Sequence, residues 1–90
     1  MPSSANNGHV RAVLTEPFVE SFLEAPPDIQ KTFGKQLAHL LRDARHPSLR
    51  AKKLGDRADR WDARVNDAWR FYYYREADTY YLVDITPHPK

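Results

Sequence analysis

The 90-residue chain contains no cysteine, only three glycines and a single methionine. The absence of cysteine excludes disulfide bonds, thiolate catalysis and cysteine-based zinc sites, and it fits a reducing compartment such as the cytoplasm. No apolar run approaches the roughly 18 residues that a membrane-spanning helix needs, so we expect no membrane partner. No two histidines have the His-x-x-x-His spacing of a metal enzyme, so no metal or other cofactor is expected.

Basic residues are concentrated in one segment of the chain. The net charge is only +2, but residues 45–75 hold nine Lys and Arg against four Asp, whereas both flanking segments are net acidic. This distribution favours an anionic partner such as nucleic acid or an acidic protein. A basic surface in contact only with water is the simpler alternative.

The first half of the chain predicts a strand followed by two helices. Residues 1–8 are expected to form a flexible N-terminal tail, and residues 9–90 a single domain. We expect a strand at 9–14, a helix that Thr15 caps, and a second helix that begins at the Pro26-Pro27 pair and ends at His46-Pro47. Gly34, inside the second helix, indicates a close approach to the sheet. The apolar stripe of this helix recurs at steps of three and four: Ile29, Phe33, Leu37, Leu40, Leu41 and Ala44.

The second half predicts three strands, at 60–66, 68–76 and 79–86, joined by short connections into an antiparallel meander. Alternation places Arg64 on one face of its strand and Arg70, Tyr72 and Tyr74 on one face of the next. In the last strand the pattern sets Tyr81, Val83 and Ile85 against Tyr80, Leu82 and Asp84. The order β-α-α-β-β-β predicts an α+β fold, with a helical hairpin packed on one face of a twisted, mainly antiparallel sheet.

Several side chains of this half suit a phosphodiester. If Arg64 and Arg70 share a face, both guanidinium groups can reach one phosphate. An exposed tyrosine ring can stack on an unpaired base, and the imidazole of His88 can donate or accept a proton near neutral pH. The candidate catalytic residues are therefore Arg64, Arg70 and His88, and the candidate RNA-binding residues are Lys52, Lys53, Tyr72 and Tyr74. The simpler alternatives are that Arg70 pairs with Asp62 or Asp84, and that His88 lies in a frayed terminus.

Four motifs of the chain resemble the RelE/ParE toxin superfamily of bacterial toxin–antitoxin systems. They are His46-Pro-Ser-Leu-Arg-Ala-Lys-Lys-Leu, Trp61-Asp-Ala-Arg-Val, Trp69-Arg-Phe-Tyr-Tyr and Pro87-His88-Pro89. The resemblance covers about residues 10–88 and implies the same β-α-α-β-β-β fold. It also implies a metal-independent mRNA interferase that attacks through the ribose 2′-OH on ribosome-bound mRNA and so inhibits translation. A cognate antitoxin is the implied protein partner.

The resemblance assigns roles to some residues and leaves one role open. Arg70 matches the family's arginine on the strand at 68–76, and Arg64 matches a lysine or arginine on the preceding strand. His88 occupies the place of the C-terminal histidine that acts as acid or base in YoeB-like members. Asp62 stands where other members have a lysine, and no late tyrosine is present, so the general base is not identified. The alternatives are a ParE-like toxin that inhibits DNA gyrase and a non-catalytic interaction module.

Overall fold

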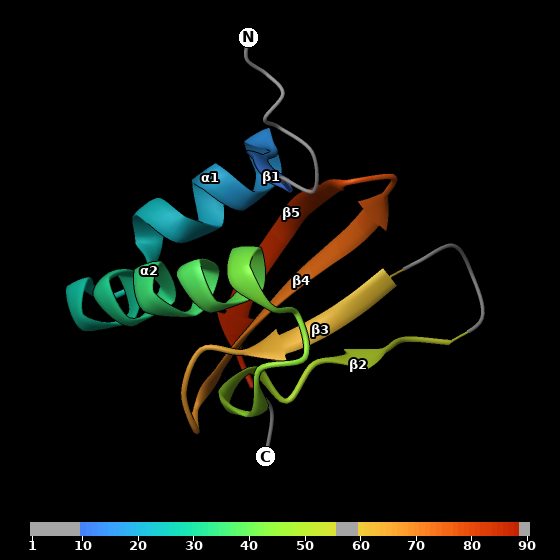
Figure 1. The fold of residues 1–90 in the computed structure, drawn as a ribbon. Helices are drawn as coiled ribbons and strands as arrows, with labels where there is room; N and C mark the ends of the chain where they lie inside the picture. Colours follow the sequence, from blue (N-terminus) through green and yellow to red (C-terminus); the bar gives the residue numbers. More distant parts are fainter. Residues whose placement is uncertain (1–9, 56–59, 89–90) are drawn as a thin grey trace, which may run out of the picture.

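The computed structural model describes residues 10–55 and 60–88, and the predicted tail at 1–8 lies outside them. The elements are β1 (Arg11–Leu14), α1 (Glu16–Glu24), α2 (Pro27–Arg42), the 3-10 turn η1 (Pro47–Leu49), β2 (Lys52–Lys53), β3 (Arg60–Arg64), β4 (Trp69–Glu76) and β5 (Thr79–Pro87). The strands form one sheet in the order β1-β5-β4-β3-β2, and α2 lies across it (Figure 1). The predicted α+β fold is thereby confirmed. No helix in these two ranges has the length and apolar character to cross a bilayer.

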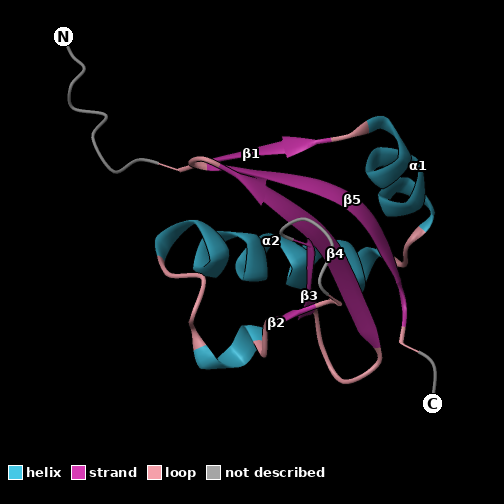
Figure 2. Cartoon of the chain, turned by 90° about the vertical axis from the view of Figure 1, so that its right-hand side faces the viewer, coloured by secondary structure: helices cyan, strands magenta, loops and turns pink. Residues whose placement is uncertain are grey.

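The sheet is mainly antiparallel, as predicted, because β2, β3, β4 and β5 each run antiparallel to their neighbours. Among the described strands, β1 alone pairs in parallel, along the first half of β5. Figure 2 shows β4 and β5 as the long curved pair of the sheet, with β1 beside β5. The structure adds the two-residue strand β2, which the sequence pattern did not predict.

The predicted starts of both helices are confirmed. The backbone N–H of Phe18 donates to Thr15 Oγ1, and that hydroxyl donates to the carbonyl of Leu82 at 2.8 Å, which fastens the start of α1 to β5. Pro27 occupies the first turn of α2, where no backbone N–H is needed. The helix ends at Arg42, a few residues before the predicted stop. The reason is that Asp43 adopts an extended backbone and its carboxylate accepts from the N–H of Arg45.

The core lies between α2 and one face of the sheet. Phe33 of α2 meets Phe71 of β4 edge-on, with ring centroids 5.1 Å apart, and it also contacts Phe18 of α1. The predicted stripe of α2 supplies Ile29, Phe33 and Leu40 as buried residues, and its remaining members pack partly buried against them. Among the described residues, the completely or almost completely enclosed side chains are Phe18, Leu40, Leu49, Ala63, Phe71, Tyr73, Leu82 and Ile85.

The predicted faces are correct for β3 and β4 but wrong for β5. Phe71 pairs with Ala63 on one side and Ile85 on the other, so these three share the core face. A register shift between Tyr72 and Tyr73 leaves Val83 without a partner in β4. Because such a bulge inserts one residue, the alternation of β5 changes phase there. The buried residues of β5 are therefore Tyr80, Leu82 and Ile85.

Gly34 does not serve a close approach to the sheet, because it is exposed and an added Cβ would meet nothing within 4 Å. We expect Gly34→Ala to raise the free energy of unfolding by about 0.5–1 kcal/mol, since alanine restricts the unfolded chain and favours the helix. Urea denaturation measures the difference. Gly55→Ala is the contrasting variant. Gly55 has a φ of +56°, which alanine adopts at a cost, so this substitution should lower the free energy of unfolding. A lower stability of Gly34→Ala would contradict this account.

Candidate functional site

The face of β2–β5 that is turned away from α2, here called the open face, carries two arginines side by side. The register pairs Arg64 of β3 directly with Arg70 of β4, so both side chains leave the sheet on the side opposite Phe71. Arg70 is paired in turn with Thr86 of β5. Like charges on directly opposite residues repel each other, so this arrangement needs anions nearby.

Arg70 is neutralised by a mostly buried carboxylate on the adjacent strand. Its Nη1 donates to Asp62 Oδ1 at 3.0 Å, and the two side chains are only 16% and 9% exposed. Of the two alternative partners that the sequence offered for Arg70, the structure contains Asp62. Asp84 accepts from Ser21 Oγ of α1 at 2.8 Å. Removing one member of the Arg70–Asp62 pair would leave a mostly buried charge without its partner, which is strongly unfavourable.

Arg64 is neutralised differently. Its Nη2 lies 2.6 Å from Asp67 Oδ1, but the two side chains are 28% and 92% exposed. Ion pairs in contact with water contribute little free energy, about 0–1 kcal/mol. Arg64 can therefore exchange Asp67 for an external anion at small cost, whereas Arg70 is held in a fixed position by Asp62.

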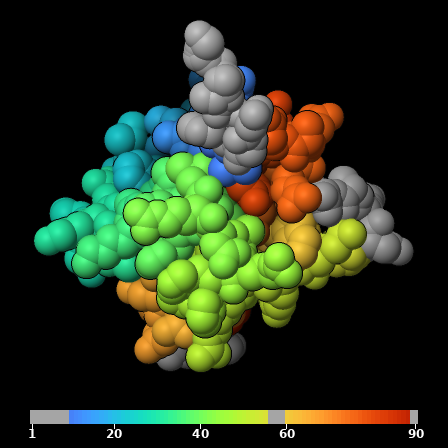
Figure 3. Space-filling model, viewed as in Figure 1, coloured from blue at the N-terminus to red at the C-terminus, as the bar shows by residue number. Residues whose placement is uncertain are grey.

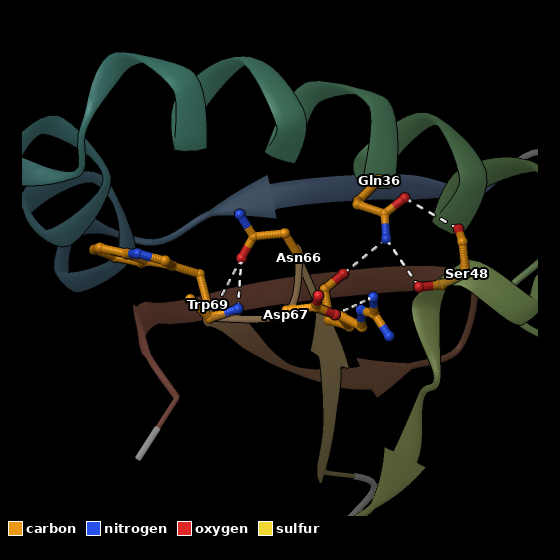
Figure 4. Close-up of polar contacts among 7 residues, drawn as sticks. Gln36, Ser48, Asn66, Asp67 and Trp69 are labelled. Carbon is orange, nitrogen blue, oxygen red and sulfur yellow. Dashed lines mark hydrogen bonds and ion pairs between the residues drawn. The ribbon is translucent and has the colours of Figure 1, made fainter. Parts of the chain in front are cut away.

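A buried glutamine fixes the backbone beneath Arg64 (Figure 4). Gln36 of α2 is 6% exposed, and its Nε2 donates to the carbonyls of Arg64 at 2.8 Å and Ser48 at 3.1 Å. Ser48 Oγ donates to Gln36 Oε1 at 3.2 Å. One side chain thereby ties α2, η1 and the end of β3 together. Sequence reasoning missed Gln36, although it lies three residues after Phe33 and four before Leu40 on the apolar stripe.

The turn between β3 and β4 places Asp67 beside Arg64. Asn66 Oδ1 accepts from the backbone N–H groups of Ala68 at 2.8 Å and Trp69 at 2.9 Å, which closes the turn (Figure 4). His88 lies next to the same turn, since its N–H donates to the carbonyl of Ala68 at 2.6 Å. This bond extends the pairing of β4 and β5 beyond Pro87 and leaves the side chain of His88 exposed. The backbone of His88 is thus fixed beside Ala68, two residues before Arg70 in the chain.

The structure separates the two lysines of β2. Lys52 is paired with Asp62, and Lys53 with Trp61, so they project toward opposite faces of the sheet. Lys52 joins the open face, while Lys53 lies on the side of α2.

The two predicted tyrosines also lie on the open face. Tyr72 is half-buried and is paired with Asp62. Tyr74 stacks on Tyr81 of β5 with ring centroids 5.1 Å apart and an interplanar angle of 20°. The open face thus combines Lys52, Arg64 and Arg70 with aromatic surface, and His88 lies beside it. Cations and rings in this arrangement suit a phosphate-bearing chain with unpaired bases.

Comparison with known proteins finds the same fold in toxins of toxin–antitoxin systems. The YoeB dimer structure from Staphylococcus aureus has a TM-score of 0.74 and 14% identity, covering 90% of this chain and 99% of that one. YafQ in the E. coli DinJ–YafQ toxin–antitoxin complex has a TM-score of 0.75 and 12% identity, covering 89% and 93%. The RelE–RelB complex from Pyrococcus horikoshii has a TM-score of 0.73 and 17% identity, covering 88% and 94%. No family model matches the chain, and no curated protein matches it in sequence.

We predict that the hydrogen bonds of Gln36 contribute measurably to the free energy of unfolding. Gln36→Leu keeps the side chain's approximate size but leaves the carbonyls of Arg64 and Ser48 without this donor. We expect the free energy of unfolding to fall by about 1–3 kcal/mol, measured by urea denaturation. The exposed neighbour Lys35 provides the control, since Lys35→Gln should stay within about 0.5 kcal/mol of the parent chain. Equal stability of Gln36→Leu and the parent would contradict the role of Gln36.

Proposed function

We propose that this chain is the toxin of a type II toxin–antitoxin pair, acting in the cytoplasm as an endoribonuclease on ribosome-bound mRNA without a metal or other cofactor. The observation that carries the proposal is the pairing of Arg64 with Arg70 on the open face, with the backbone of His88 bonded at Ala68. The likeness in fold to solved RelE, YoeB and YafQ toxins supports it. So does the third cation, Lys52, on the same face.

In the proposed reaction the ribose 2′-OH transfers its proton to a water molecule, and the 2′ oxygen attacks the adjacent phosphorus. Arg64 and Arg70 bind the non-bridging oxygens and stabilise the negative charge that grows on them, which guanidinium groups do without exchanging a proton. The bond from phosphorus to the 5′ oxygen breaks, and His88 donates the proton that this oxygen takes up. The products are a 2′,3′-cyclic phosphate and a 5′-hydroxyl. Lys52 holds a neighbouring phosphate, and Tyr72 and Tyr74 stack on bases.

The proposed protein partner is an antitoxin. Solved structures with this fold include complexes named RelE–RelB and DinJ–YafQ. In this chain, Val13 and Leu14 of β1 and Leu23 of α1 are 40%, 47% and 69% exposed. Because β1 is the last strand of the described sheet, an extended chain can add to its outer edge and cover these apolar side chains. The excess of basic residues favours an acidic partner.

Arg70 has both a structural contact and a proposed catalytic role, and a pair of variants separates them. Arg70→Gln should reduce mRNA cleavage by about a hundredfold or more and lower the stability, because Asp62 loses its partner. The double variant Asp62→Asn/Arg70→Gln should recover stability, since the pair becomes neutral, but should not recover cleavage. Thermal unfolding and mapping of 2′,3′-cyclic ends during in vitro translation measure the two properties. Arg11→Gln, an exposed change of equal charge on β1, is the control.

Cleavage by the double variant at the parent rate would contradict the catalytic role and leave Arg70 with its ion pair alone. If the parent chain left mRNA intact but blocked supercoiling by DNA gyrase, the ParE-like alternative would replace the ribonuclease. If the parent chain neither cleaved mRNA nor blocked gyrase, the non-catalytic interaction module would replace the ribonuclease.

The exposed ion pair of Arg64 gives a second test. Asp67→Asn removes the carboxylate that competes with phosphate for Arg64, so we expect affinity for single-stranded RNA to rise about two- to tenfold at low salt. Stability should change by no more than about 0.5 kcal/mol. Fluorescence anisotropy with a labelled 2′-O-methyl oligonucleotide measures binding without cleavage. Asp78→Asn changes the same charge in the turn between β4 and β5, so it corrects for net charge. Equal gains in both variants would show that Asp67 does not compete for Arg64.

A further inference from the structure

A cavity of about 660 Å³ lies on the side of the sheet opposite to Arg64 and Arg70. Its outer wall is the segment that follows α2, and its floor is formed by Trp61, Tyr73 and Tyr80 of three adjacent strands. Figure 3 looks onto this side, where the light-green segment after α2 lies close to the orange strand residues. This volume is in the range of small-molecule sites, about 300–1,000 Å³. None of the candidate residues of the open face lines it.

The charge around this cavity is strongly positive. Among the residues that the structure describes, its lining holds four arginines against the one carboxylate of Asp43: Arg42, Arg45, Arg50 and Arg75. Within residues 10–55 and 60–88, Arg64 and Arg70 have carboxylate partners, but none of the four cavity arginines does. Four guanidinium groups around one space repel each other, and a bound anion relieves that repulsion. The cavity therefore offers positive charge that the described residues do not neutralise.

The floor of the cavity supplies flat aromatic surface. Trp61 is half-exposed and lies parallel to Tyr73, with ring centroids 6.5 Å apart and an interplanar angle of 6°. Tyr80 meets Tyr73 edge-on at 5.3 Å and braces it from β5. Tyr73 and Tyr80 are almost completely buried, so Trp61 contributes the ring that a ligand can reach. An indole ring fixed by a stacked neighbour is a suitable platform for a planar base.

Arg50 occupies a strained backbone conformation at the edge of this cavity. It follows η1 with φ 44° and ψ 44°, in the left-handed region that glycine adopts more easily. Its N–H donates to the carbonyl of Pro47 at 3.2 Å, which closes the turn. A non-glycine residue in such a position is a cost to folding that points to a use for its side chain. Here the side chain adds a guanidinium group to the cavity.

We infer that this cavity binds a nucleotide, with the base against Trp61 and the phosphate held by Arg50, Arg75 and their neighbours. The ligand is either a free nucleotide or a single nucleotide turned out from RNA, and both present the same base and phosphate. An acidic peptide would satisfy the arginines, but a nucleotide also supplies a planar ring that can pack on the accessible part of Trp61. The site is separate from the proposed cleavage site because it lies on the other side of the sheet.

The two tryptophans of the chain allow a direct measurement. In Trp69→Phe the remaining tryptophan is Trp61, and we expect AMP and ATP to quench its fluorescence saturably at micromolar to millimolar concentrations. Pyrophosphate is the anion without a base, and a 2′-O-methyl RNA hexamer is the RNA arm. Saturation by AMP or ATP indicates a free nucleotide, and saturation by the hexamer alone indicates RNA. No saturation by any of them, equal binding of pyrophosphate and ATP, or binding of polyglutamate in their place would overturn the inference.

Variants in the same background test the two parts of the site. Arg75→Gln and Arg50→Gly should each weaken nucleotide binding about tenfold or more, and Arg50→Gly should also raise the melting temperature because the turn is relieved. In the chain with both tryptophans, Trp61→Leu should weaken binding about ten- to a hundredfold by isothermal titration calorimetry. Arg11→Gln should bind like the parent. Arg70→Gln should also retain nucleotide binding, so that failure here is distinguishable from failure of the cleavage proposal. Unchanged binding in both arginine variants would contradict the site.

Discussion

The enclosed position of Phe71 in β4 decides what each side of the sheet presents. Its ring contacts Phe33 of α2 edge-on, and its neighbours in the sheet are Ala63 and Ile85. Because side chains alternate along a strand, this burial directs Arg70 to the opposite face, and the pairing of β3 then brings Arg64 beside it. A slip of one residue would drive Arg70 into the aromatic core, which is strongly unfavourable for an unpaired charge. The arginine pair is thus a consequence of core packing.

The arginines on the two sides of the sheet differ in whether they have carboxylate partners, and this difference affects how each side can bind an anion. On the open face, Arg64 and Arg70 already contact Asp67 and Asp62. An RNA phosphate that binds there displaces Asp67 from Arg64, while Arg70 keeps its contact with Asp62. The net electrostatic gain is therefore small, and geometry has to supply the selectivity. At the cavity, no carboxylate of the described residues neutralises the four arginines. An anion there gains the attraction of the arginines without displacing a partner.

The sequence predicted those features that repeat locally and missed those that depend on distant residues. The stripe of α2, the Thr15 cap and the alternation of β3 and β4 follow from near neighbours in the chain. Alternation left the shared face of Arg64 and Arg70 as a condition, which the register between β3 and β4 then fixes. In β5 both alternating sets are apolar, so the pattern could not locate the bulge at Val83. β2 is too short to show a pattern. The hydrogen bonds of Gln36 and the cavity itself arise only when separate elements pack. The sequence named Asp62 and Asp84 as alternative partners of Arg70, and packing selects Asp62.

The two edges of the sheet differ in a way that constrains the proposed antitoxin. At one edge, Lys52 and Lys53 project to opposite faces of β2, and lysines on an edge strand oppose the addition of a further strand. At the other edge, β1 exposes Val13 and Leu14 and offers apolar contacts. Arg64 lies three strands away from β1, roughly 14 Å across the sheet. A chain that docks at β1 therefore needs about five further extended residues to cover the arginine pair. Docking at that edge and blocking the open face are thus separate tasks for two segments of the same partner.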